Sequence, residues 1–152
     1  MKVFLLAVTI LLLISRIKST PRELSKTLYE NNLQNNMTKF KKQIDDIETM
    51  SDRNTVLQVT QYIIAVLVWL YSLLIIVYYI LIGNRFQTHT MMLILTALQI
   101  VTMFISTKRT IKEFDLVNIE NMSNVTFHRS WFLFNVVLDY VYYPMTIYLL
   151  LN

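Results

Sequence analysis

The sequence of 152 residues contains no cysteine, one glycine and two prolines. Without cysteine there are no disulfides, thiolate metal ligands or cysteine nucleophiles. A single glycine excludes a glycine-rich phosphate loop. The scarcity of glycine and proline also makes tight turns and sheet corners rare, which favours helices. Charged residues make up only 16% of the chain and hydrophobic residues 55%, a balance typical of a protein that is solvated mainly by lipid.

Residue patterns for catalysis are missing as well. His89 and His128 are far apart and have no metal-ligand spacing around them. The chain has no nucleophile elbow, no HExxH motif and no obvious pair of catalytic carboxylates. We therefore expect a protein that is not an enzyme and that needs no cofactor or metal. Basic residues are interleaved with acids, which argues against nucleic acid as a partner, while the net charge of +4 favours an anionic lipid surface.

The most decisive stretch is Val59–Ile82, which runs for 24 residues without a charge. About 20 apolar residues are enough to cross the hydrocarbon core of a bilayer, and a helix that is apolar on every face has no place on the surface of a soluble domain. The sequence therefore predicts a transmembrane helix. Tyr62 and Tyr78 suit the lipid–water interface, whereas Trp69 and Tyr71, near the middle, are expected to pack against another helix.

A second span is predicted over Thr90–Ile105. Gly83 and the two residues after it read as the end of the central helix, and the short loop that follows requires the second span to return antiparallel, as a hairpin over residues 58–106. This second span carries polar residues on one helical face: Thr96, Gln99, Thr102 and Ser106. We expect that face to contact other helices; the alternative is the lining of a polar pore.

The last span is predicted over Trp131–Leu151, within residues 130–152, and Pro144 should kink it. Asn135 and Asp139 lie one turn apart on one face, and Asp139 falls near the middle of the bilayer, where a carboxylate is costly. Its least costly state is a protonated acid that shares a hydrogen bond. Gln99, at comparable depth, is the expected partner. This intramembrane polar site serves either as interhelical packing or as a proton or ion relay.

Residues 1–19 have two interpretations. Twelve apolar residues after Lys2 match the core of a signal peptide better than a full span. A cleavage site after Ser19 is a poor match, however, because Ile17 takes the place of a small residue. Arg16 and Lys18 follow the apolar run directly, which suits a retained first transmembrane helix. The chain therefore has three spans, or four if this segment stays.

Residues 20–57 are predicted to form an amphipathic, coiled-coil-like helix that begins at Thr20, with Pro21 at the first helical position and Glu23 at the third. Apolar residues recur at steps of four and three, which is a heptad pattern. They form a predicted association seam: Leu33, Met37, Phe40, Ile44 and Ile47. Its partner is a second copy or another protein. The alternative is a helix that lies on the bilayer or on the protein's own spans.

Residues 107–129 are polar and are predicted to form an interfacial loop or short helix. Three glycosylation sequons, at Asn36, Asn121 and Asn124, fall in the two polar segments. A cleaved leader would place both segments in the lumen with the sequons. A retained first helix with its N-terminus outside would instead satisfy the positive-inside rule. Both arrangements place residues 20–57 and 107–129 on the same side of the membrane.

One stretch resembles a known class of proteins. Ser51-Asp52-Arg53 leads through Gln58 and Gln61 into an aromatic span with Leu70-Tyr71 and Tyr78-Tyr79. This pattern, over about residues 34–81, resembles small coiled-coil membrane proteins of large DNA viruses of the phycodnavirus and mimivirus kind. The resemblance implies a structural protein of the virion membrane beneath the capsid.

Taken together, the sequence predicts an all-α integral membrane protein in which an N-terminal amphipathic or coiled-coil helix precedes a three-helix transmembrane bundle. The expected function is a non-enzymatic, multi-pass membrane scaffold or assembly protein in an endomembrane or a virion inner membrane. Its partners are the lipid bilayer and a protein, or a second copy, bound through the N-terminal helix. The alternative is a small transporter or channel subunit that uses Asp139 and Gln99.

Overall fold

The computed structural model describes residues 1–45, 50–113 and 129–152, without the side chains of residues 32–34, 36, 37, 40, 41, 43–45, 50–54 and 113. Within these ranges the chain is all-α, as the sequence predicts. Its helices are α1 (Lys2–Leu24), α2 (Lys26–Asp45), α3 (Met50–Arg85), α4 (Thr90–Glu113) and α5 (Arg129–Leu151).

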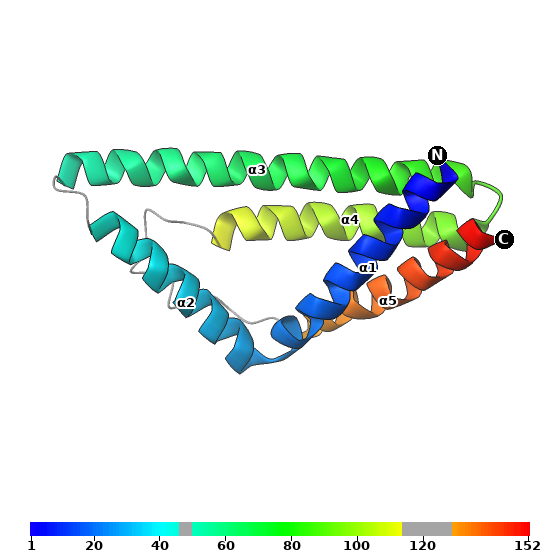
Figure 1. Cartoon of the computed structure of the whole chain (residues 1–152), viewed down its shortest axis with the longest axis horizontal. Helices are drawn as coiled ribbons and strands as arrows, with labels where there is room; N and C mark the ends of the chain where they lie inside the picture. Colours follow the sequence, from blue (N-terminus) through cyan, green and yellow to red (C-terminus); the bar gives the residue numbers. More distant parts are fainter. Residues whose placement is uncertain (46–49, 114–128) are drawn as a thin grey trace.

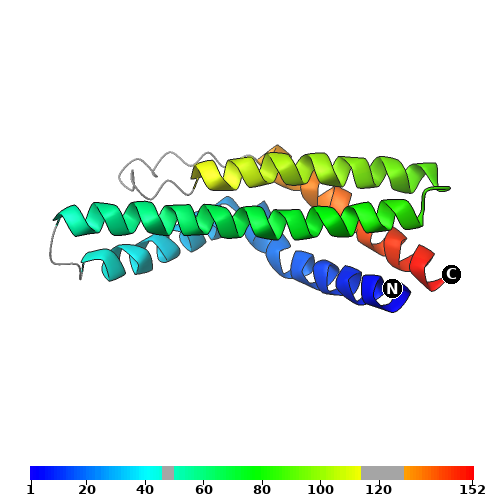
Figure 2. The same ribbon diagram turned by 90° about the horizontal axis from the view of Figure 1, so that it is seen from above.

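Four of these helices contain stretches that are long and apolar enough to cross a membrane: Lys2–Leu24, Thr55–Arg85, Thr90–Lys112 and Arg129–Leu151. Helix α2 is polar and is not among them. In the two ribbon views, both chain termini and the α3–α4 turn lie at one end of the molecule, which we call the terminal end (Figures 1 and 2). We call the other half of the molecule the α2 end: α1 passes into α2 and α5 begins near mid-length, α4 ends beyond them, and α2 runs on to the far end, where α3 begins (Figures 1 and 2).

The spans pack mainly as two antiparallel pairs, α1 with α5 and α3 with α4, and α4 also contacts α5. The core that joins the pairs is rich in tyrosine. Tyr79 packs edge-on against Tyr142 with ring centroids 5.3 Å apart, and Tyr78 and Tyr143 flank this pair. Leu5 of α1 is buried in the same cluster. These large rings fill the space between helices near the terminal end.

Gly83 lies inside α3, which corrects its predicted role as a helix stop. The helix continues to Arg85, and Gly83 has no positive φ. The chain turns only at Phe86–Thr88 before α4 begins. A Cβ atom on Gly83 would lie 3.2 Å from Cγ2 of Thr96, so glycine is needed for the close approach of α3 and α4. Small residues commonly allow two transmembrane helices to approach closely in this way.

The first helix is longer than predicted, so the expected helix start at Thr20 is wrong. Helix α1 runs through Pro21 to Leu24, and the break comes at Ser25, whose backbone is extended. The Ser25 hydroxyl accepts a bond from the Leu28 amide in the first turn of α2. Serine is favoured at this position because its hydroxyl accepts a hydrogen bond from an amide in the first turn, which has no backbone acceptor within the helix. Residues 20–57 therefore divide among the end of α1, α2 and the start of α3.

Further predictions concern the length of α4, the aromatic residues of α3, the heptad seam and the sequons. Helix α4 extends eight residues beyond the predicted span, to Glu113, and the polar face of that span does turn inward. Trp69 and Tyr71 are exposed rather than packed on another helix of this chain, and Tyr78 is buried. The seam side chains and that of Asn36 are not described, and Ile47, Asn121 and Asn124 lie outside the described residues altogether. The seam is Leu33, Met37, Phe40, Ile44 and Ile47.

The Gly83–Thr96 contact gives a first prediction. Gly83→Ala should lower the free energy of unfolding in detergent micelles by about 1 kcal/mol, because the added methyl group overpacks the helix pair. Thr96→Ser removes Cγ2 and keeps the hydroxyl. In the Thr96→Ser background, Gly83→Ala should be neutral or stabilising, since alanine is the better helix former. Purely additive effects of the two substitutions would show that this contact does not set the spacing of α3 and α4.

Candidate functional site

The central polar feature is an ion pair between the first and the last span. Arg16 Nε of α1 lies 2.7 Å from Asp139 Oδ2 of α5, and both side chains are only 14% exposed. The pair is not aligned as a hydrogen bond. The other carboxylate oxygen, Oδ1, accepts a hydrogen bond of 2.7 Å from Nε2 of Gln99 in α4. Asp139 thus joins three helices through its two oxygens.

Arg16 is itself held between two carboxylates. Its NH1 group donates to both oxygens of Glu23 at 2.7 Å. Glu23 lies seven residues further along α1, two turns on the same face, which brings the two side chains together. Arginine suits this position because its guanidinium presents several donors in a fixed geometry. This partly buried cation therefore has anionic partners on its own helix and on α5.

A chain of hydroxyl groups extends this site toward the α3 side. Tyr79 Oη donates to Gln99 Oε1 at 3.3 Å and shares a 3.0 Å hydrogen bond with Tyr143 Oη. The resulting path Asp139–Gln99–Tyr79–Tyr143 connects α3, α4 and α5. We call Arg16, Glu23, Gln99, Asp139, Tyr79 and Tyr143 the polar cluster. In an apolar interior an unpaired polar group costs several kcal/mol, so these mutual bonds stabilise the arrangement of the helices.

Separate polar contacts tie the remaining helix pairs. Thr9 of α1 and Tyr78 of α3 share a 2.7 Å hydrogen bond although they are far apart in the sequence. Ser72 of α3 and Thr107 of α4 share a 2.6 Å hydrogen bond that joins the two helices nearer the α2 end. In both pairs one hydroxyl also bonds a backbone carbonyl of its own helix. These hydroxyl pairs join α1 to α3 and α3 to α4.

Phe132 joins helices at the α2 end. Its ring lies 5.4 Å from the ring of Tyr29 in α2, and the Arg109 guanidinium of α4 lies 5.6 Å from its centroid. The second contact is a cation–π arrangement. The start of α5 is therefore packed against both α2 and the last turns of α4.

The structure brings together two of the three residues of the intramembrane polar site predicted from the sequence. Gln99 and Asp139 are bonded to each other, whereas the Asn135 side chain donates to the Trp131 carbonyl of its own helix at 2.8 Å. Sequence reasoning missed Arg16 as the charge partner of Asp139. The signal was a cation directly after the first apolar run, but it carries no information on which later acid it meets.

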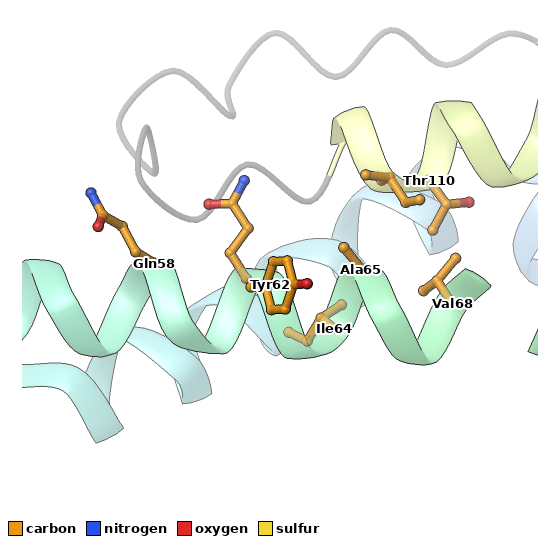
Figure 3. Close-up of a pocket in the computed structure, with 8 residues that line it drawn as sticks. Gln58, Tyr62, Ile64, Ala65, Val68 and Thr110 are labelled. Atoms are coloured by element: carbon orange, nitrogen blue, oxygen red, sulfur yellow. The ribbon is translucent and has the colours of Figure 1, made fainter. Parts of the chain in front are cut away.

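The arrangement connects α1, α3, α4 and α5 through one set of polar contacts. Among the described residues, no three histidine or acidic side chains are grouped so that they hold a metal ion. A pocket of about 330 Å³ lies elsewhere, between α3 residues Gln58–Val68 and Thr110 and Ile111 of α4 (Figure 3). Asp139 is not among the residues that line this pocket.

No family model matches the chain, and neither a curated protein nor a solved structure shows significant similarity to it. Any functional conclusion therefore rests on the chain's own residues.

The ion pair gives a second prediction. Arg16→Leu should lower the free energy of unfolding by about 3–5 kcal/mol, because it leaves Asp139 without its counter-ion. Asp139→Leu should cost less, because Arg16 keeps its ion pair with Glu23. The double variant should be more stable than Arg16→Leu alone, because no unpaired carboxylate remains on α5 and Glu23, which loses its partner in both, is the more exposed acid. Unfolding in detergent micelles measures all three.

The exposed pair Lys26–Glu30, 3.7 Å apart, serves as the control. Lys26→Leu and Glu30→Leu should each change the stability by less than about 1 kcal/mol and show little coupling. Equal coupling in both pairs, or none between Arg16 and Asp139, would contradict the structural role of the buried pair.

Proposed function

We propose that this chain is a four-span integral membrane protein that acts as a non-enzymatic scaffold or assembly subunit. The observation that carries the proposal is the partly buried contact of Arg16 with Asp139, which ties the first span to the last. Both carboxylate oxygens and the guanidinium have partners. A site whose polar groups are paired in this way favours a packed interface over a hydrated path.

The proposal includes α1 as a permanent span. Cleavage after Ser19 would remove Leu5 and Thr9, which are buried against the other helices. It would also remove Arg16 and leave Asp139 without its cation in the middle of α5. An unpaired carboxylate at that depth costs several kcal/mol. Retention of α1 avoids this cost, so the interpretation as a fourth helix is preferred to that of a signal peptide.

The distribution of charge supports one orientation for the four spans. Of the fourteen lysines and arginines, only Lys2 and Arg85 lie at the terminal end. The others, apart from the buried Arg16, belong to the end of α1, to the segments between spans at the α2 end, or to their flanks. Basic residues near span ends stay in the cytoplasm. The α2 end is therefore proposed to be cytoplasmic, with both termini on the opposite side.

The scaffold role is assigned to α2 and its surroundings. Helix α2 is a polar helix at the α2 end, and Tyr29 packs it against Phe132 of the bundle. Its heptad pattern supports binding of a second copy or a partner protein, and attachment to the membrane raises the effective concentration for such pairing. A role as a structural protein of a virion inner membrane is supported by the resemblance of residues 34–81.

A transporter is the second candidate function, favoured by one observation. The path Asp139–Gln99–Tyr79–Tyr143 is a continuous series of hydrogen-bonding groups across three spans. The Arg16→Leu, Asp139→Leu double variant separates the two functions. A scaffold with this double substitution still assembles, whereas a transporter that uses Asp139 as its carrier loses its flux in liposomes, because leucine neither binds nor releases a proton.

The proposed orientation predicts the state of the sequons. Expressed in the presence of microsomes, the protein should carry no glycan at Asn36, Asn121 or Asn124, because all three face the cytoplasm. A sequon placed on a flexible extension after Asn152 should be modified, and the glycan on this extension is the positive control. Glycans on the native sequons would instead place the α2 end in the lumen.

The scaffold role predicts association through the heptad seam. In membranes, Phe40→Glu and Ile44→Glu should each abolish chemical crosslinking of the protein to itself or to its partner, because a buried carboxylate disrupts an apolar seam. Lys42→Glu, off the seam, is the matched control and should leave the crosslinks in place. Crosslinks that persist in both seam variants would remove the seam from the proposal.

A further inference from the structure

Two of the spans match the thickness of one membrane. Residues Thr90–Thr107 of α4 carry no charge and, at about 1.5 Å per residue, are about 26 Å long, while Trp131–Leu151 of α5 are about 30 Å long. The hydrocarbon core of a bilayer is about 30 Å thick. Lys108 follows the first stretch directly, and Arg129 lies two residues before the second, so both stretches have a basic residue at the α2 end.

Both stretches end at the same level. Gln99 of α4 bonds Asp139 of α5, and Thr107 and Trp131 each lie eight residues from this bond toward the α2 end. Because the two helices run antiparallel, these two residues mark one plane, which we call the boundary. In the four-span arrangement proposed above, lipid tails surround the bundle between the boundary and the terminal end.

Helix α3 continues far past the boundary. Ser72 lies at the boundary, since it bonds Thr107, and every residue from Tyr71 back to Met50 lies beyond it. Both ribbon views show α3 extending past the end of α4 (Figures 1 and 2). Residues Val59–Tyr71 carry no charge, and this stretch is about 18 Å long. We call it the overhang.

The overhang has an apolar surface that lipid tails do not cover. A membrane shifted far enough to include it would also take in Lys108, Arg109 and Arg129, and basic residues are costly in the hydrocarbon core. Within the overhang, Tyr62 is 72% exposed and Leu67 is 59% exposed. A contiguous apolar surface outside the lipid marks a site of protein–protein contact.

The exposed side of α3 carries an aliphatic heptad. From Val56 onward, aliphatic residues recur at alternating steps of three and four, which is the a and d pattern of a coiled coil. Their exposed fractions run from 40% at Val66 to 53% at Leu70. Ser72 and Tyr79, which bond residues of α4, lie on the opposite side of the helix. We call the exposed heptad the α3 stripe: Val56, Val59, Ile63, Val66, Leu70 and Leu73.

We propose that the α3 stripe binds the α3 stripe of a second copy, in a parallel dimer with its two-fold axis along the membrane normal. Copies inserted under the same charge rule share one orientation, so their overhangs stand on the same side of the membrane. A two-fold axis places each stripe residue opposite itself. The overhang has no charge, so two copies do not repel each other and no charged partner is selected. The proposal rests on the four-span arrangement proposed above.

The driving force comes from the part of the stripe beyond the boundary. Apolar helices gain little by meeting inside lipid, whereas in water they remove apolar surface from the solvent. Attachment to one membrane raises the effective concentration of the two copies, which offsets the short length of the contact. Specific interfaces bury about 800 Å² per partner, and the stripe offers a surface of that order together with the flanking side chains of Tyr62, Leu67 and Trp69.

The test uses single cysteines in the full chain, which has no cysteine of its own. In phosphatidylcholine vesicles, Val59→Cys and Val66→Cys should each form disulfide-linked dimers on mild oxidation, because the two-fold axis brings each thiol close to its copy. The yield should persist when the protein is diluted with lipid, since a stable dimer does not depend on random collision. Helix α3 contains no lysine, so amine-reactive crosslinking does not report this contact.

Matched variants off the stripe act as controls. Gln58→Cys is exposed at nearly the same depth as Val59 and should remain mostly monomeric. Ile63→Glu should lower the dimer yield of Val66→Cys by about ten-fold or more, because it places two carboxylates in an apolar contact. Gln61→Glu adds the same charge off the stripe and should leave that yield unchanged.

Two results would overturn the proposal. One is equal dimer yield at Gln58 and Val59, or a yield that falls in proportion to dilution, since either indicates collision of copies whose stripes face lipid. The other is the absence of dimers at both Val59 and Val66, which leaves the stripe to a different protein.

Extraction of the membranes with alkaline carbonate separates this proposal from the four-span arrangement. A protein that stays in the membrane pellet but forms no stripe disulfides refutes the α3 dimer alone. A protein released by carbonate refutes the four-span arrangement itself.

Discussion

The Arg16–Asp139 ion pair is the interaction on which the arrangement of the spans depends. Two charges in an apolar interior are tolerated only when they meet each other and when their remaining hydrogen-bonding groups have partners. Glu23 accepts from Arg16 NH1 and Gln99 donates to Asp139, whereas Arg16 Nε meets Asp139 as an ion pair without a hydrogen bond, and Tyr79 extends the bonding to α3. Because packing between apolar helices in lipid is weakly directional, this polar cluster gives the bundle a specific register that apolar contacts alone do not define.

The sequence was sufficient for the class of fold and for part of the site. The length of the uncharged stretches predicted the spans. The helical spacing of the polar residues in the second predicted span indicated that the face carrying Gln99 turns inward. The depth of Asp139 in its span led to the expectation of a bond with Gln99. These inferences succeed because they depend on one helix at a time, or on the depth that two residues share in the bilayer.

The remaining features depend on which helices meet. Arg16 follows an apolar run and reads equally well as the flank of a removable leader, and only its contact with α5 reveals a buried charge. Gly83 was interpreted as a helix end because glycine is common at that position, but in the structure it allows α4 to approach α3 closely. The residues Thr20–Glu23 fit a helix start by local chemistry, but α1 continues to Leu24, since its far end packs against α5. Tertiary contacts override local preference at all three places.

The same ion pair also imposes an order on biogenesis. Arg16 is made early in translation and Asp139 near the end of the chain, so at 5–20 residues per second the two are separated by on the order of ten seconds. During that interval the cation has only Glu23, on its own helix, to offset its charge. In the proposed four-span arrangement, the first helix thus enters the bilayer with an intrahelical counter-ion before the last helix is made. Glu23 keeps this contact in the finished bundle, where Arg16 pairs with Glu23 and Asp139 at the same time.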